Sequence, residues 1–194
     1  MLYTHAGPEI AVASTKAFLA QITAAYLLGL YLAQLNKKLF SGQIKDILAD
    51  LGAIPGKIEE ILAGKDQVKE LAYIHAEGFA AGELKHGPIA LIDDGQPVFV
   101  VMPSPLDRHS LHAKVVSNIQ EVRARGARTF AVAERGDAAV RGQAEVVFEV
   151  PETQPMLMPL LTTVPLQIFA LHLSTAKGLD VDQPRNLAKS VTVE

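Results

Sequence analysis

Apolar residues in the first part of the chain recur at three- and four-residue steps, which is the period of an α-helix. One such run covers residues 9–36, and a second covers residues 41–64, where Pro55 predicts a boundary or a kink near Ile54. A third helix is expected from Val68 to Gly82. The first 90 residues are therefore predicted to be mainly helical.

The first of these helices is apolar on more than one side. Leu27, Leu28 and Leu32 fill much of the face opposite the periodic positions, so the helix is expected to be covered on both sides. Its apolar stretch, Ala17–Leu35, is interrupted by polar residues and a glycine. This composition predicts a buried helix rather than a membrane span.

The period changes after residue 95. Continuous apolar runs of strand length, as in strands buried on both faces of a parallel sheet, alternate with helical stretches. Strands are predicted at 97–102, 129–133 and 145–150. Helices are predicted at 110–125, closed by Gly126, and at 155–177, with a bend at Pro165. A short helix that begins near Asp137 is expected between the last two strands.

This alternation predicts an α/β fold. Strands that follow helices at these spacings form a three-layer αβα sandwich with a parallel, flavodoxin-like sheet, here preceded by a mainly helical segment. The chain has 194 residues, of which 49% are hydrophobic, so it is long enough to bury a core.

Charge and cysteine content narrow the function. A net charge of −3 leaves no excess of cations for a phosphate backbone, so no nucleic-acid partner is expected. The chain contains no cysteine, which excludes disulfides, thiolate metal sites and a cysteine nucleophile among these residues. The opening residues MLYTHAGPEI lack the pattern of a signal peptide, so a cytoplasmic location without a membrane partner is expected.

Local signals for nucleotides or metals are weak. No Gly-x-Gly-x-x-Gly, Walker A or His-Glu-x-x-His sequence occurs. His75, Glu77, Glu83 and His86 are close in sequence but share no helical face, so no metal site is predicted from them. The pair His109 and His112 is interpreted as part of a solvated helical face.

Three segments carry more chemistry than the fold requires. The segment PEIAVASTKAF contains hydroxyl groups at a helix start, and KELAYIHAEGFAAGELKHGPIALI contains Glu70, Lys85 and His86 around a glycine-rich turn. The terminal segment DVDQPRNLAKSVTVE sets Lys189 among apolar residues. Titratable groups on loops beside a sheet are candidates for acid–base work, although capped loops and a solvated terminus explain the same residues without function.

Together these segments, in this order, resemble the isomerase part of the glutamine:fructose-6-phosphate aminotransferase (isomerising) family. The resemblance extends from about His5 to Glu194. It implies a dimer of sugar-isomerase (SIS) domains, without a cofactor, that makes glucosamine 6-phosphate from fructose 6-phosphate and ammonia. The ammonia comes from glutamine through a glutaminase domain that this chain does not contain.

The resemblance also implies roles for individual residues. Lys189 matches the lysine that forms a Schiff base with the ketose, Glu70 the carboxylate that moves a proton between C1 and C2, and His86 the ring-opening histidine contributed by the other subunit. The residues that match contacts to the sugar are Val12, Ser14 and Ala188.

The same resemblance gives a division of the chain. Residues 1–66 match the last part of a first SIS domain and a helical linker, 67–178 a second SIS domain without its first strand, and 179–194 a catalytic tail. The 194 residues alone are expected to be inactive, because the loop that holds the sugar phosphate is not among them. The alternative is a non-catalytic SIS module that binds sugar phosphate or dimerises, which would not need Lys189, Glu70 and His86.

Overall fold

The computed structural model describes residues 3–7, 15–63, 77–106 and 111–180. The chain divides into two compact units. The first consists of Met1–Ile54, Val68–Tyr73 and Leu166–Glu194, and the second of Pro55–Gln67 and Ile74–Pro165.

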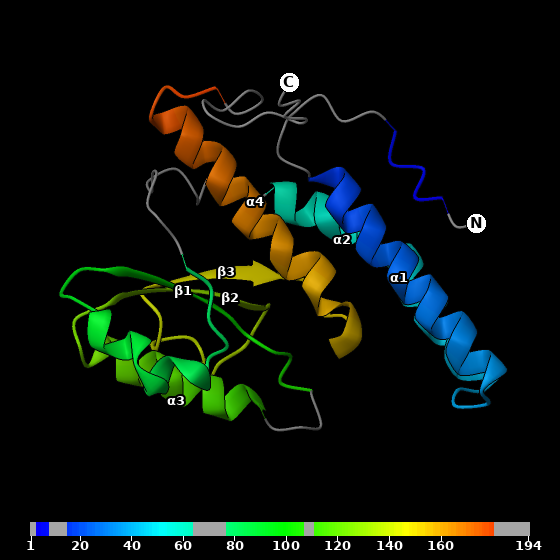
Figure 1. The fold of residues 1–194 in the computed structure, drawn as a ribbon, viewed down its shortest axis with the longest axis horizontal. Helices are drawn as coiled ribbons and strands as arrows, with labels where there is room; N and C mark the ends of the chain where they lie inside the picture. Colours follow the sequence, from blue (N-terminus) through cyan, green and yellow to red (C-terminus); the bar gives the residue numbers. More distant parts are fainter. Residues whose placement is uncertain (1–2, 8–14, 64–76, 107–110, 181–194) are drawn as a thin grey trace, which may run out of the picture. The chain divides into compact units, whose positions relative to one another are not determined.

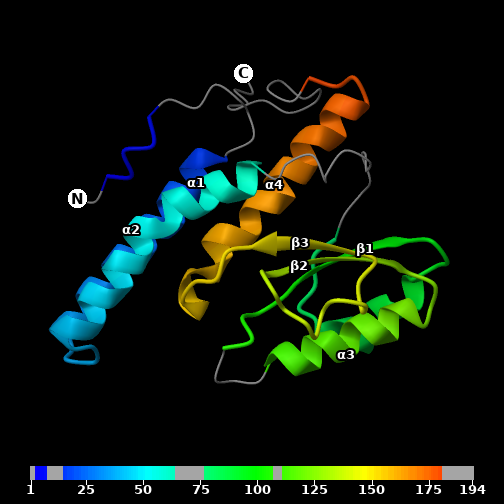
Figure 2. The ribbon, with the colours of Figure 1, turned by 180° about the vertical axis from the view of Figure 1, so that it is seen from behind.

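The first unit contains two antiparallel helices, α1 (Lys16–Leu35) and the part of α2 (Ser41–Ala63) up to Ile54. Figures 1 and 2 show them joined by a short turn. The turn ends α1 through a backbone bond from Lys38 N–H to the carbonyl of Ala33 (2.8 Å). The side chain of Gln43 accepts from the backbone N–H of Phe40 (3.0 Å) and thereby satisfies a donor at the start of α2.

Helix α1 is more exposed than its sequence predicts. Leu30 is its one buried residue, whereas Leu28 is 50% and Leu32 is 47% exposed. The described part of this chain therefore does not cover both sides of the helix, and the expected cover stays a prediction. By length and composition alone, both Lys16–Leu35 and Pro155–Ala176 would be long and apolar enough to cross a membrane, a test that core helices of soluble proteins also pass.

The second unit is built on a parallel sheet in the order β1-β2-β3. Its strands are β1 (Pro97–Val101), β2 (Arg128–Glu134) and β3 (Val146–Val150). Phe99 pairs with Phe130, and Val132 pairs with Phe148, in a parallel register. All three strands form where continuous apolar runs predicted them, and the α/β fold is confirmed.

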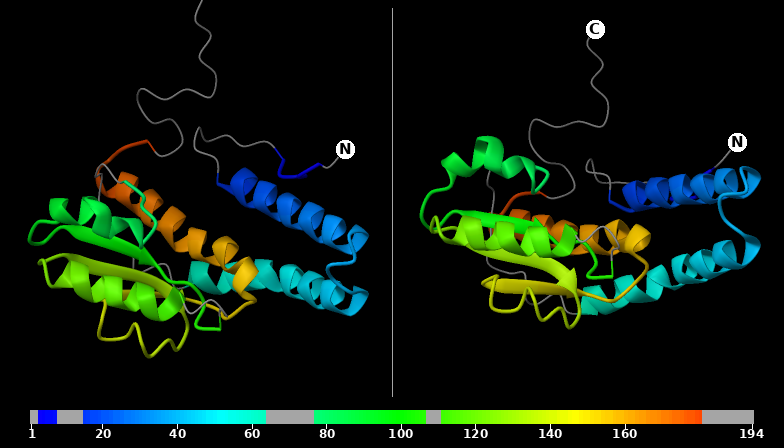
Figure 3. Two further views of the ribbon diagram at one scale, coloured as in Figure 1. Left: turned by 60° about the horizontal axis from the view of Figure 1, so that its bottom comes forward. Right: turned by 90° about the horizontal axis from the view of Figure 1, so that it is seen from below.

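Helices cover both faces of this sheet (Figure 1), so the unit has the three expected layers. Helix α3 (Leu111–Arg123) lies on one face, and the other carries the beginning of α4 (Met158–Ala176), up to Pro165. Figure 3 shows the same layers from two further directions. On the face away from α3, the rings of Phe99 and Phe130 stack with centroids 5.0 Å apart.

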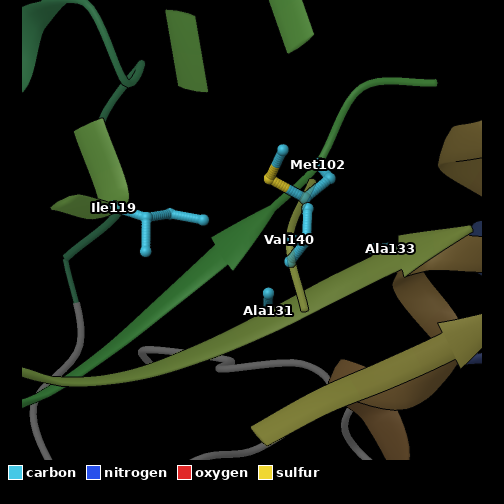
Figure 4. Packing of buried hydrophobic residues seen from close by; sticks show 5 residues of the cluster. All are labelled: Met102, Ile119, Ala131, Ala133 and Val140. Carbon is cyan, nitrogen blue, oxygen red and sulfur yellow. The ribbon is translucent and has the colours of Figure 1, made fainter. Parts of the chain in front are cut away.

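The core between α3 and the sheet is small and closely packed (Figure 4). It consists of side chains from β2, from α3, from the residue after β1 and from the loop between β2 and β3, and each is at most 1% exposed. These are Met102, Ile119, Ala131, Ala133 and Val140. The two alanines on β2 leave room for Ile119 to approach the sheet.

Gly126 closes α3 as predicted. Its N–H donates to the carbonyl of Arg123 (2.9 Å), and the next N–H, of Ala127, donates to Val122 (3.3 Å), which is the Schellman arrangement. Gly126 has φ +87°, and a Cβ there would collide with Oδ1 and the backbone of Asp94. Both the backbone conformation and the neighbouring chain therefore require glycine at this position.

Three local expectations differ from the structure. The segment between β2 and β3 forms turns rather than a helix, although Asp137 does cap its start by accepting from the N–H of Ala139 (3.1 Å). Helix α2 continues through Pro55, so the boundary expected there does not form, whereas the alternative, a kink, stays a prediction. The helix expected from Val68 to Gly82 lies partly outside the described residues, and residues 77–80, within them, are not helical.

Candidate functional site

Of the site residues predicted from the sequence, the structure describes His86. It ends a single 3₁₀ turn, Glu83–His86, and a second turn, Pro88–Leu91, follows directly. Gly87 joins the two turns with φ +153°, a conformation that side chains rarely adopt, and Pro88 starts the second turn because it needs no N–H partner there. The side chain of His86 is exposed.

Helix α3 holds this segment at two points. The side-chain Nδ2 of Asn118 donates to the carbonyl of Ala81 (3.1 Å), in a partly buried bond. Nζ of Lys85 lies 2.7 Å from Oε1 of Glu121, in a pair whose side chains are 48% and 33% exposed. Asn118 and Glu121 are one turn apart on α3, so both contacts come from one face of the helix.

The other predicted site residues lie outside the described residues. These are Val12, Ser14, Glu70, Ala188 and Lys189. Their grouping around a bound sugar stays a prediction.

A second cluster of titratable groups lies where the parallel strands end. Nε2 of His112, at the start of α3, is 2.6 Å from Oδ2 of Asp137, and these side chains are 12% and 4% exposed. Glu134, the last residue of β2, is 5% exposed, and Ser104, after β1, is 2% exposed. Burial raises the pKa of Glu134, and the negative charges of Glu152 and Asp137 raise it further, while a hydrogen bond from Ser104 and the charge of His112 oppose the shift.

This cluster is enclosed by the chain itself. From the last turns of α2, Lys57 contacts the backbone carbonyl of Glu152, and Glu60 pairs with Arg135 (3.1 Å). Among the described residues, no group of three or more His, Asp or Glu side chains has the arrangement of a metal site. Internal pairing is therefore the interpretation that the geometry supports for His112 and Asp137. Oε1 of Glu134, in contrast, is buried without a hydrogen-bond partner in the described part of the chain.

The interpretation of His112 as a solvated residue is wrong. Asp137 lies 25 positions further along the chain, so helical spacing carries no sign of the pair. The order of strands and helices could have indicated this pair. A histidine at the start of a helix that follows one strand, and an acid after the next parallel strand, lie at the same edge of a sheet.

Comparison with known proteins assigns most of the second unit to a domain family. Residues 62–177 match the model of the SIS domain family. A glutamine–fructose-6-phosphate aminotransferase (isomerising) of Corynebacterium diphtheriae is 59% identical over 226 residues, covering 100% of this chain and 36% of that protein. Proteins of the same name from Streptomyces coelicolor and Mycobacterium tuberculosis are 53% and 50% identical, again over the whole of this chain.

The chain thus spans little more than a third of the length of the curated relatives it matches. Each of these alignments extends over 226 positions, whereas this chain has 194 residues, so the relatives contain positions that the chain lacks.

Solved structures agree on the fold. The C-terminal domain of glucosamine-fructose-6-phosphate aminotransferase from Francisella tularensis matches with a TM-score of 0.70 and 32% identity, over 93% of this chain and 59% of that one. Glucosamine-6-phosphate deaminase from Thermotoga maritima matches with a TM-score of 0.59 and 20% identity, over 94% of this chain and 58% of that one, which shows a shared fold alone.

Proposed function

This chain belongs to the SIS domain family, and on that premise we propose that it supplies sugar-isomerase residues of a glutamine–fructose-6-phosphate aminotransferase. The proposed reaction converts fructose 6-phosphate and ammonia, released from glutamine by a separate glutaminase domain, to glucosamine 6-phosphate. The supporting observation is 50–59% identity, along the whole chain, to proteins that carry this name.

The proposed chemistry begins at Lys189. Its neutral amine attacks the carbonyl carbon of the open-chain ketose, water leaves, and an imine forms that acidifies the proton at C1. Ammonia then adds to the imine carbon, C2, and the lysine amine leaves, so that C2 carries the nitrogen of the product. Glu70 accepts the proton from C1, which gives an enolamine, and returns a proton to C2 as the C1 hydroxyl becomes the aldehyde of glucosamine 6-phosphate. A single carboxylate serves both carbons because they are adjacent.

Ring opening precedes this chemistry and is assigned to His86. An imidazole exchanges protons readily near neutral pH, as transfer to and from a ring oxygen requires. The exposure of His86 on its short turn fits a group that acts outside its own subunit. We therefore propose a homodimer in which each protomer offers His86 to the other, with backbone groups of Val12 and Ala188 and the hydroxyl of Ser14 contacting the sugar.

The chemistry needs no cofactor, and the cytoplasm is the compartment we propose for it. The proposed organisation is the last part of a first SIS domain and a linker at 1–66, a second SIS domain at 67–178, and a catalytic tail at 179–194. The extra positions in the relatives support the proposal that the second domain lacks a strand that they contain.

The function is tested in a hybrid enzyme. The 194 residues replace the positions that they match in the Corynebacterium diphtheriae protein, whose remainder, including the positions that this chain lacks, supplies the rest of the enzyme. With fructose 6-phosphate and ammonium, the hybrid is expected to form glucosamine 6-phosphate. Borohydride is expected to trap a hexitol on Lys189, as located by peptide mapping.

The adduct should disappear in Lys189→Arg, because the guanidinium stays protonated and does not condense with the ketose. It should persist in the control Lys114→Arg, which changes an exposed position of α3. Trapping spread evenly over the lysines, or synthesis that survives Lys189→Arg, would contradict the proposed role. Binding of sugar phosphate without trapping or turnover would instead support the non-catalytic module.

A further inference from the structure

The segment that carries His86 has little regular structure of its own. Its 3₁₀ turn has four residues, is preceded by irregular residues 77–80 and is followed by a glycine with positive φ. A turn this short does not fix the direction of a side chain without outside contacts. A general acid–base must nevertheless hold its reacting nitrogen within hydrogen-bond reach of the substrate.

The two contacts from α3 are placed to supply that restraint. Asn118 binds the carbonyl of Ala81, two residues before the turn, and Glu121 binds the ammonium of Lys85, the residue before His86. The segment is therefore held on both sides of Gly82–Leu84, against one face of a helix whose buried residue Ile119 belongs to the core on the sheet. Figures 1 and 2 show it beside α3.

Helix α3 itself is firmly fixed. Ile119, between the two holding residues, is fully buried in the core, and Val122 is 1% exposed. Asn118 and Glu121 thus connect an exposed, irregular turn to one of the most tightly packed elements of the unit.

We infer that Asn118 and Glu121 are positioning residues that hold the turn so that the imidazole of His86 meets the ring oxygen of a cyclic sugar phosphate. The inference rests on the role proposed for His86. Neither residue touches substrate, and their action is through the backbone at Ala81 and the side chain of Lys85.

The first test uses the 194-residue chain without any assay. Lys85→Glu and Glu121→Lys each place like charges together, and the double variant restores an opposite pair. Amide hydrogen exchange of residues 82–87 is expected to rise about tenfold in each single variant, the ratio expected for a loss of about 1.4 kcal/mol of local stability. It should return to the parent value in the double variant.

The controls separate local from global effects. Gln120→Lys introduces the same charge beside Glu121, but Gln120 bonds to Gln143 instead, so exchange of the turn should stay unchanged. Asn118→Leu, which removes the donor at similar volume, should raise exchange as the single charge variants do. Unchanged exchange, a rise that the double variant fails to reverse, or a fall in the thermal midpoint of the whole chain that accounts for the rise would overturn the inference.

The second test uses the hybrid enzyme with two substrates. Fructose 6-phosphate is mostly cyclic, whereas its 5-deoxy analogue lacks the hydroxyl that closes the furanose ring and needs no ring opening. Asn118→Leu and Glu121→Lys are expected to lower kcat about tenfold on the cyclic substrate, with KM within a factor of two, and to change kcat on the analogue less than twofold. Equal losses on both substrates would show a merely structural role and overturn the inference.

His86→Asn distinguishes the inference from the function on which it rests. Should this variant keep full kcat on the cyclic substrate, the role proposed for His86 is wrong. Should it lose activity on that substrate while the α3 variants do not, the positioning role of Asn118 and Glu121 is wrong and that of His86 stands.

Discussion

Nε2 of His112 lies 2.6 Å from Oδ2 of Asp137 and joins the start of α3 to the loop that follows β2. The second carboxylate oxygen of Asp137 accepts from the N–H of Ala139 (3.1 Å). Both oxygens of one buried carboxylate are thus used, one to form a turn and one to fix a helix. The pair therefore has a structural role in the domain.

Removal of either partner is expected to destabilise the chain. His112→Leu and Asp137→Ala should each lower the free energy of unfolding by about 1–3 kcal/mol, because a buried polar group loses its partner. In urea unfolding, the double variant should show a coupling of about 0.5–3 kcal/mol. Arg141→Ala, which breaks an exposed pair with Glu149, should cost less than about 1 kcal/mol. Strict additivity of the two buried changes would refute the interaction.

Glu134 should make stability depend on pH. Burial raises its pKa in the folded state, so the folded chain binds its proton more tightly than the unfolded chain does. Stability from this group is present below the unfolded pKa and is lost as pH rises through the folded pKa. Glu134→Gln is therefore expected to gain about 1 kcal/mol at pH 8 and nothing at pH 4, as measured by urea unfolding at both values.

Glu145 is a control for which the stability is expected to depend on pH in the opposite direction. A hydrogen bond from Arg128 lowers the pKa of its exposed carboxylate, so its stabilisation is present above the unfolded pKa and is lost as pH falls through the folded pKa. Glu145→Gln should therefore reduce stability at pH 8 rather than increase it. A Glu134→Gln effect that does not vary with pH would contradict the assignment.

Gly126 and Gly142 form a matched pair for backbone strain. Both have positive φ, +87° and +82°, but a Cβ at Gly126 would meet the backbone and side chain of Asp94, whereas none of the described atoms lies within 4 Å of one at Gly142. Gly142→Ala is expected to cost about 1–2 kcal/mol from φ alone. Gly126→Ala should cost clearly more, about 3 kcal/mol or above, in the same unfolding assay. Equal costs would show that the contact with Asp94 is unimportant.

Ile119 tests the core beneath α3. Ile119→Ala should lower the free energy of unfolding by about 2–5 kcal/mol and Ile119→Val by about 0.5–1.5 kcal/mol, because the surrounding side chains only partly fill the space. Val101→Ala, at a strand position that is 44% exposed, is the control and should cost less than Ile119→Ala. A tolerated Ile119→Ala would mean that this core is not closely packed.

The sequence predicted the elements whose signal is local. The run from Pro97 to Val101 was predicted as a strand because β-branched and aromatic residues follow each other without a polar residue, although none of its residues is fully buried in the described structure. Gly126 was predicted as a helix end because that depends only on the adjacent turn. Turns between β2 and β3 stand in place of the expected helix because about five residues separate Gly136 from Gly142, both of which have positive φ, and so short a segment does not sustain a helix.

What depends on distant residues was not predicted. The exposure of α1 and the burial of His112 depend on which other segments lie against them. The spacing of apolar residues along a helix does not show which segments those are. The proposed roles of Lys189, Glu70 and His86 came from a resemblance of whole motifs, because a lysine, a glutamate and a histidine far apart in sequence have no spacing that identifies a sugar site.

Helix α3 has polar attachments near both ends, and these constrain its length. His112 and Glu121 are nine residues apart, which is about 13 Å along the axis and about two and a half turns, so they point to opposite sides of the helix. One inserted or deleted residue between them would rotate one attachment by about 100° relative to the other. Substitution at exposed positions of α3 that make no such contact, such as Lys114, is therefore open to protein engineering. A change in the length of α3 would instead detach either the buried aspartate or the turn that carries His86.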